Sequence, residues 1–180
     1  MTNPAPPFSC TYTPNVAELL IQLNCSLAIT TYQAGKLIFL SPDGPNAMRQ
    51  LPRDFDKPMG MAISQNIMAL ATKDEVVVFA NAPKLATGYP VKPNFYDAFY
   101  VPRASYYTGN IDLHDMDWDK EDRLWAVNTL FSCLVTIDSA YSFKPRWMPP
   151  FIKSLESSDM CHLNGMAMVD EMPRHSFSFC

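Results

Sequence analysis

The sequence predicts an all-β protein made of β-propeller-like repeats of four-stranded antiparallel blades, with a short N-terminal helix. The apolar runs are strand-sized and are separated by turn residues. The chain has 16 prolines and 6 glycines, and the prolines are scattered along it. Because proline lacks a backbone donor, it sits at strand ends and in loops, which opposes long helices. A turn-and-strand pattern also recurs at roughly fifty residues, the length of a long propeller blade.

Residues 1–12 are expected to form a flexible N-terminal arm. Thr13 followed by Pro14 has the pattern of an N-cap and a first helical position. We expect the helix to end near Asn24, because its apolar residues fall on one face: Val16, Leu19, Leu20 and Leu23.

Short apolar runs predict the strands that follow. Three are expected in the first repeat, at 27–32, 36–41 and 49–51, with a strong turn at 42–45. Three more are expected at 60–63, 68–72 and 76–79, followed by a long proline- and tyrosine-rich connection from Ala82 to about Gly109. The pattern then returns at 115–118, 124–129, 133–138 and 146–148, and begins again at 163–168. Residues 175–180 break the pattern where a second strand should follow Asp170.

Three repeat openings align with one another, at residues 58–62, 113–117 and 163–167. Met59, His114 and Asn164 then occupy equivalent positions just before the innermost strands. An ordinary β-sandwich also contains many short strands. The recurring register of turn and strand favours the propeller over the sandwich.

Residues 13–180 hold about three blade units, whereas propellers typically close with about four to eight blades. We therefore expect a partial, truncated propeller domain whose C-terminal blades are missing. The chain is then the N-terminal part of a larger protein.

Charge and cysteine usage limit the partners and the compartment. The net charge is −4 and no run of Lys and Arg exists, which argues against a nucleic-acid partner. The longest apolar stretches are strand-sized, so no membrane span is expected. The N-terminus does not have the pattern of a secretory signal. We expect a cytoplasmic protein with free thiols; disulfides are the alternative for its five cysteines.

Several motifs together resemble a known family. They are the runs at 31–36, 55–60, 79–83, 112–115, 124–129, 131–134, 145–152 and 161–165. As a set they resemble a bacterial family of conserved hypothetical proteins, a domain of unknown function, from about Leu19 to about Asp170. The resemblance implies a fold but no known activity.

A weaker resemblance is to the six-bladed propellers of the gluconolactonase and strictosidine-synthase kind. Their blade opening, Asn-Gly-Leu-Ala, looks like the run 164–167. The resemblance implies a calcium ion at the channel mouth. Where that family has Asn-Asp, however, this chain has His114-Asp115, and imidazole is a poor ligand for a hard cation.

Propeller geometry brings blade openings together at one mouth of the channel, so the candidate site consists of residues near the openings. The ligand-binding candidates are His114, Asp115, Asn164, Asp112 and His162. His114, Asp115 and Asn164 are also candidate ligands for a divalent metal ion, which suits a borderline transition metal better than calcium. The same residues can instead be structural ties that bond turn amides.

The expected function is binding of a small molecule or a protein partner by a propeller-type module. The alternative is a metal-dependent, lactonase-like hydrolase with its site at the channel mouth. Whether the protein is an enzyme is left open, because propellers host many functions.

Overall fold

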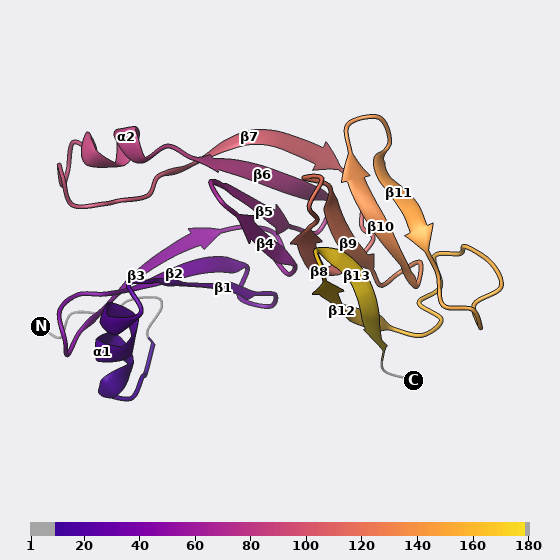
Figure 1. Ribbon diagram of the computed structural model, residues 1–180, viewed down its shortest axis with the longest axis horizontal. Helices are drawn as coiled ribbons and strands as arrows, with labels where there is room; N and C mark the ends of the chain where they lie inside the picture. The colour runs from indigo at the N-terminus through magenta and orange to yellow at the C-terminus, as the bar shows by residue number, and fades with distance from the viewer. Residues whose placement is uncertain (1–9, 179–180) are drawn as a thin grey trace, which may run out of the picture. The chain divides into compact units, whose positions relative to one another are not determined.

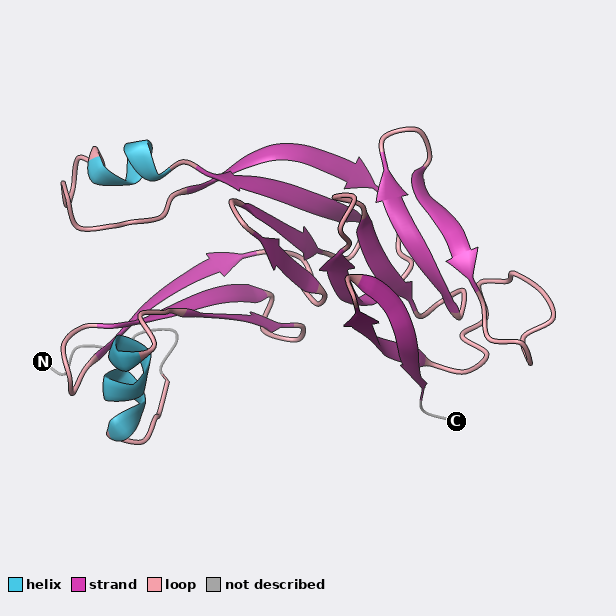
Figure 2. Ribbon diagram, viewed as in Figure 1, coloured by secondary structure: helices cyan, strands magenta, loops and turns pink. Residues whose placement is uncertain are grey.

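The computed structural model describes residues 10–178, so most of the predicted arm at 1–12 lies outside the described residues. The predicted all-β class is confirmed: the structure is 47% strand and 8% helix, with four antiparallel sheets of two to four strands and a short helix near the start (Figure 2). The contacts divide the chain after Pro58 into two compact units. Within residues 10–178, no helix is long and apolar enough to cross a membrane.

The first unit begins with helix α1, Asn15–Gln22, which packs on strand β2 through Ala17 and Leu20. The predicted cap was wrong by one residue. Pro14 occupies the N-cap position with helical backbone angles, and no side chain caps the helix. The carbonyl of Thr13 accepts a hydrogen bond from the amide of Val16, so the backbone, and not the threonine hydroxyl, begins the helix.

The first unit also contains a three-stranded sheet in the order β1-β2-β3. Its strands are β1, Leu27–Thr31; β2, Lys36–Pro42; and β3, Met48–Asp54. Gly35 turns the chain between β1 and β2 with a φ of +62°, and a Cβ there would lie 2.9 Å from the carbonyl oxygen of Phe55. Strand β3 is longer than the predicted run 49–51 because it pairs with the whole of β2.

The second unit begins with a four-stranded sheet in the order β4-β5-β6-β7. Its strands are β4, Met61–Ser64; β5, Ile67–Ala71; β6, Glu75–Asn81; and β7, Tyr100–Tyr107. The predicted connection from Ala82 to Gly109 was wrong, since it contains helix α2, Pro83–Thr87, and the strand β7. Pro102 is tolerated in β7 because the strand pairs only with β6, next to a register shift.

A second four-stranded sheet follows, in the order β11-β10-β9-β8. Its strands are β8, Leu113–Trp118; β9, Leu124–Asn128; β10, Cys133–Asp138; and β11, Ser142–Trp147. The last sheet is a hairpin of β12, Leu163–Val169, and β13, Met172–Ser178.

The prediction that the pattern breaks at 175–180 was wrong, because β13 is the second strand that should follow Asp170. Asp170 and Glu171 both have positive φ, 50° and 57°. Two such residues between paired strands make a type I′ hairpin turn, which matches the twist of the strands. Residues 179–180 lie outside the described range.

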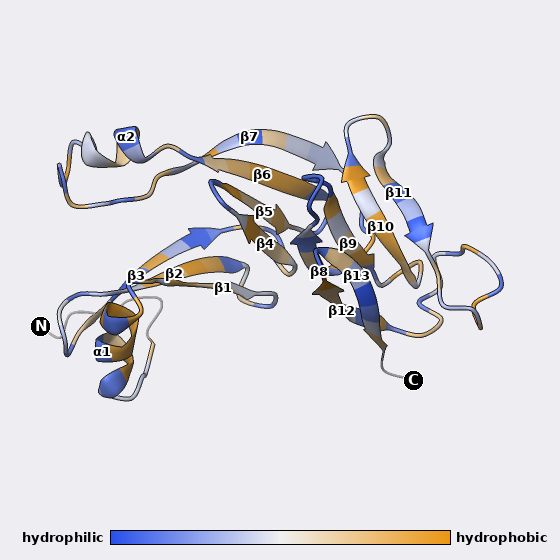
Figure 3. Ribbon diagram, viewed as in Figure 1, coloured by the Kyte–Doolittle hydropathy of each residue, from blue (hydrophilic) through white to orange (hydrophobic). Residues whose placement is uncertain are grey.

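Strands β9 and β10 of the β8–β11 sheet are buried on both faces. Ala126 and Val135 belong to a core shared with β4, β5 and β6, whereas Val127 and Leu134 belong to a core shared with β12. In Figure 3 the hydrophobic colour is strong on β6 and β10, and the outer strands β11 and β13 are more hydrophilic. Within the second unit the first strands of successive sheets adjoin one another, β4 beside β8 and β8 beside β12 (Figure 1). This order brings the predicted repeat openings together.

Candidate functional site

The first repeat opening carries a bulge just before β4. The amide of Met59 donates to the carbonyl of Ala71 at 3.1 Å, and the amide of Ala71 donates to the carbonyl of Gly60 at 2.8 Å. Two residues on this strand therefore face one on β5, which defines a β-bulge.

The other two openings are irregular at the equivalent positions. In β8 the register with β9 shifts between Leu113 and Met116, and in β12 the register with β13 shifts between Leu163 and Gly165. Bulges re-aim side chains and are frequent beside functional sites. The three aligned openings thus share a backbone irregularity as well as a sequence pattern.

Gly60 holds the β4 opening against β8. Its amide donates to the carbonyl of Leu113 at 3.2 Å. A Cβ at this position would lie 3.1 Å from the Leu113 carbonyl oxygen and 3.2 Å from backbone atoms of Asp115. Only glycine allows the two backbones to approach this closely without a shift.

Asp115 connects the β8 opening to β12. One carboxylate oxygen, Oδ1, accepts a hydrogen bond from the amide of Met116 at 2.9 Å. The other, Oδ2, accepts one from the amide of Met166 in β12 at 3.0 Å. A charged acceptor that satisfies an amide of the neighbouring strand fixes the register between the two openings.

His114 and Asn164 meet directly across these openings. His114 Nδ1 lies 2.7 Å from Asn164 Oδ1, and both side chains are partly buried. An amide oxygen only accepts hydrogen bonds, so His114 Nδ1 carries the proton and donates it. In the neutral ring the opposite nitrogen, Nε2, then bears a lone pair.

His162 lies beside His114 in the turn before β12. The ring centroids are 5.1 Å apart and the rings are nearly perpendicular, at 86°. His162 Nδ1 lies 2.7 Å from Asp159 Oδ2, so it donates to the carboxylate and its Nε2 is also the acceptor nitrogen of the neutral ring. The two imidazoles are therefore held in the same way, each by an oxygen at Nδ1.

Four of the five predicted site residues come together: His114, Asp115, Asn164 and His162. Asp112 does not join them through its carboxylate, which forms no hydrogen bond with any other residue from 10 to 178. Asp112 instead has a φ of +55°, and its carbonyl accepts the amide of Thr129 at 3.1 Å. It therefore shapes the turn before β8.

Sequence reasoning missed Asp159 and Gly60. The signal for Asp159 was its position three residues before His162, within reach of the ring across one turn. The close approach of Gly60 to β8 leaves no signal in a single sequence beyond the glycine itself.

The calcium ion implied by the weaker resemblance does not fit these residues. Calcium takes six to eight oxygen ligands. Here both oxygens of Asp115 and the oxygen of Asn164 are engaged by hydrogen bonds, and the two rings offer nitrogen instead of oxygen. Among the described residues, no three or more His, Cys, Asp or Glu side chains are grouped to hold a metal ion.

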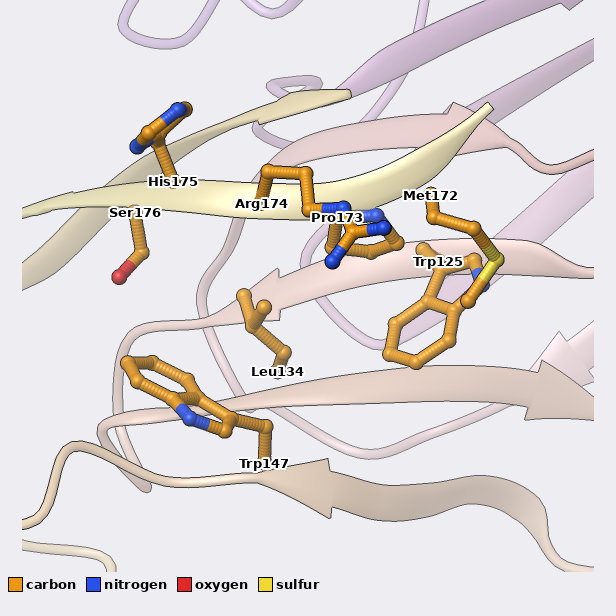
Figure 4. Close-up of a pocket in the computed structure, with 8 residues that line it drawn as sticks. All are labelled: Trp125, Leu134, Trp147, Met172, Pro173, Arg174, His175 and Ser176. Carbon is orange, nitrogen blue, oxygen red and sulfur yellow. The ribbon is translucent and has the colours of Figure 1, made fainter. Parts of the chain in front are cut away.

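A pocket of about 190 Å³ lies elsewhere in the second unit, between the β8–β11 sheet and β13 (Figure 4). Figure 4 shows the run 172–176 of β13 along one side and Trp125, Leu134 and Trp147 on the other. Ligand pockets usually measure about 300–1,000 Å³, so this one has room for little more than a single ring. None of the residues that meet at the repeat openings lines it, and nothing in the sequence pointed to it.

Asp119 fixes the tryptophan wall of this pocket. Its buried carboxylate accepts hydrogen bonds from Trp125 Nε1 at 2.7 Å and Arg123 Nε at 2.6 Å. Burial alone raises the pKa of Asp119, but the bonds from Trp125 and Arg123 outweigh it and hold the pKa below its usual value. The carboxylate therefore stays ionised and serves a structural role.

Comparison with known families identifies one match. A family described as Domain of unknown function (DUF4915) matches residues 14–180. No curated protein matches the chain.

Proposed function

The chain belongs to the family described as Domain of unknown function (DUF4915), and we propose that it is a ligand-binding module of the β-propeller kind. Its site is the His114 cluster, defined as His114, His162 and Asn164 with the supporting Asp115 and Asp159. The ligand is a small polar molecule that offers hydroxyl or amino hydrogens.

The stacking of the sheets supports the propeller interpretation. Each four-stranded sheet runs in sequential antiparallel order, as a blade does, and its first strand adjoins the first strand of the next. The β8–β11 sheet is packed between two neighbours, with separate cores on its two faces. The residues that meet at the openings, His114 and Asn164, are 50 apart in sequence, which suits one blade per repeat.

The single observation that carries the binding proposal is the bond between His114 Nδ1 and Asn164 Oδ1. It joins two repeat openings and fixes the ring so that Nε2 is the acceptor. His162, held in the same tautomer by Asp159, lies against this ring. An oriented imidazole acceptor on His114 suits a ligand that offers a hydroxyl or amino hydrogen, as in a polyol, a sugar or an amino alcohol.

Binding is favoured over hydrolysis because of what Asp115 does. A lactonase-like site needs a carboxylate to hold a metal ion or to act as a general base. Both oxygens of Asp115 accept backbone amides instead, one of them from the neighbouring sheet. We therefore assign Asp115 to fixing the register between neighbouring strands and not to catalysis.

We also propose a reducing compartment such as the cytoplasm. Cys10, Cys25, Cys133 and Cys161 are free thiols, and free thiols persist where glutathione and thioredoxin keep them reduced.

Nuclear magnetic resonance of the ring protons tests the proposal, since the chain has only 3 histidines. We expect myo-inositol, glucose or ethanolamine, added with EDTA, to shift the ring signals of His114 and His162 saturably. His175, in β13, is the internal control and should not move. Asn164→Ala should weaken the response at least tenfold. If no probe gives a saturable shift, or if His175 shifts equally, the binding proposal is wrong.

A further inference from the structure

The pocket between the β8–β11 sheet and β13 has the size and the lining of a site for one small ring. Five of its eight lining residues are aromatic or apolar: Trp125, Leu134, Trp147, Met172 and Pro173. A dry apolar cavity of about 150 Å³ is large enough to hold benzene. At about 190 Å³, this pocket therefore accommodates one aromatic ring with a small substituent.

Two opposite walls of the pocket are held by one guanidinium group. Arg123 Nε donates to the buried carboxylate of Asp119 at 2.6 Å, and the same carboxylate accepts a hydrogen bond from Trp125 Nε1 at 2.7 Å. Arg123 Nη2 also donates to the sulfur of Met172 in β13, at 3.9 Å. The indole on one wall and the thioether on the other are thus fixed before a ligand arrives, which lowers the entropy cost of binding.

Arg174 supplies a positive charge to this apolar pocket. The pairing of β12 with β13 shifts between Ala167 and Met168, which leaves Arg174 as the extra residue of a β-bulge. Side chains of a regular strand face alternate sides, so the bulge explains why the consecutive residues 172–176 all line one pocket. Figure 4 shows the guanidinium of Arg174 pointing toward Trp125. Among the residues that the structure describes, this guanidinium forms no ion pair.

We propose that this pocket binds a small aromatic carboxylate. The ring packs against the indoles of Trp125 and Trp147, where contacts between aromatic groups contribute beyond the area that they bury. The carboxylate accepts hydrogen bonds from Arg174, because a guanidinium matches a carboxylate with two parallel N–H groups. This second site goes beyond the function proposed for the His114 cluster.

The combination of an apolar lining and one cation selects this class of ligand. A small inorganic anion would leave the two indoles without a contact, and a cationic ring would be repelled by Arg174. A sugar carries several hydroxyl groups, and Leu134, Met172 and Pro173 offer them no strong hydrogen-bond partner. An aromatic ring with one carboxylate uses both the indoles and the guanidinium.

The indole N–H signals in two-dimensional ¹⁵N–¹H spectra of the full chain test the proposal, because the chain has only 3 tryptophans. Benzoate is the probe, and benzyl alcohol is its neutral control. We expect benzoate to shift the signals of Trp125 and Trp147 saturably and benzyl alcohol to bind at least tenfold more weakly. Trp118 packs against the core shared with β4, β5 and β6 and does not line the pocket, so its signal should not move.

Arg174→Gln is the principal variant, because Arg174 is exposed and the loss of its charge should leave the fold intact. It should lower the affinity for benzoate at least tenfold and leave the affinity for benzyl alcohol unchanged. Arg103→Gln is the matched control: this arginine is exposed in β7 and does not line the pocket, so the variant should bind benzoate as the wild type does. Trp147→Leu, at a side chain that is 41% exposed, should weaken the binding of both probes.

Three results would overturn the proposal. They are the absence of a saturable shift with benzoate, equal affinities of the wild type for benzoate and benzyl alcohol, and equal affinities of the wild type and Arg174→Gln for benzoate. Benzoate should leave the ring signals of the His114 cluster unmoved, whereas the polyol and amino alcohol probes should shift them. The two proposals can therefore fail separately.

Discussion

Asp115→Ala should destabilise the fold, and the hydrogen bonds of this carboxylate determine by how much. The change removes two hydrogen bonds and leaves the amide of Met166 in β12 without its acceptor. A hydrogen bond to a charged group contributes about 1.5–3 kcal/mol net. The bond to Met166 joins two sheets and should contribute in this range. The bond to Met116 is local and partly exposed, so we expect about 2–4 kcal/mol in total.

Asp117→Ala is the matched control. Asp117 lies two residues further along the same strand, and its carboxylate accepts the amide of the next residue, Trp118, at 2.8 Å. It therefore reproduces the local bond of Asp115 without the bond between sheets. The difference between the two variants isolates the bond from Asp115 to Met166.

Urea and thermal unfolding, followed by circular dichroism, measure this difference. For a domain of about 150 residues or more, 1 kcal/mol corresponds to roughly 2–4 °C in Tm. Asp115→Ala should thus melt roughly 5–15 °C below the wild type, and Asp117→Ala should melt close to it. Neutral surface substitutions change the free energy of unfolding by up to about 0.5 kcal/mol. If the free energies of unfolding of the two variants differ by less than this, Asp115 does not hold the openings together.

Three further predictions concern Asp119, Gly60 and two of the cysteines. The pKa of Asp119 is lowered in the folded state, so the ionised carboxylate stabilises the fold above its unfolded pKa of about 3.9, and this contribution is lost as pH falls through the folded pKa. In urea unfolding at several pH values, Asp119→Asn should be less stable than the wild type at pH 7 and should lose less stability below about pH 5. Gly60→Ala should lower the free energy of unfolding by about 1–3 kcal/mol, because the added Cβ meets backbone atoms of β8. Gly88→Ala is the control: its Cβ would have its nearest neighbour at 3.8 Å, so the free energy of unfolding should change by less than about 0.5 kcal/mol. Burial raises the pKa of the Cys133 thiol to about 11. At pH 8 an aromatic disulfide reagent should therefore label the exposed Cys25 rapidly and Cys133 only after unfolding. Rapid labelling of both thiols in the folded protein would contradict this burial.

The sequence was most informative where a pattern recurs. The openings at 58–62, 113–117 and 163–167 repeat a methionine at the same offset, and this alignment placed His114 and Asn164 at equivalent positions. Their contact at 2.7 Å depends on that register. The bulges at the openings were not predictable, because a bulge depends on hydrogen bonds between strands and not on a residue type.

Elements without an apolar pattern could not be predicted. Strand β13 lacks a regular alternation of apolar and polar residues, and it forms because the turn at Asp170 and Glu171 folds it against β12. Strand β7 contains Pro102, which normally argues against a strand, yet an edge position beside a bulge accepts it. In both cases pairing with a neighbour overrides local propensity.

The role of Asp115 also required the structure. From the sequence it had two alternatives, a ligand in the site or a tie to turn amides. Its hydrogen bonds to the amides of Met116 and Met166 identify it as a tie between β8 and β12. The sequence could place this carboxylate near the openings but could not show which atoms it faces.

The protonation pattern of the two rings tests the central claim most directly. Two-dimensional ¹⁵N–¹H spectra of histidine-labelled protein, recorded without metal and above the pH at which the rings are charged, report which ring nitrogen carries the proton. The geometry predicts Nδ1–H for both His114 and His162, with Nε2 as the acceptor. Asn164→Ala should release His114 from this state and leave His162 in it. Spectra showing Nε2–H at both rings in the wild type would contradict the account, because His114 would then present a donor and not the acceptor that binds a ligand.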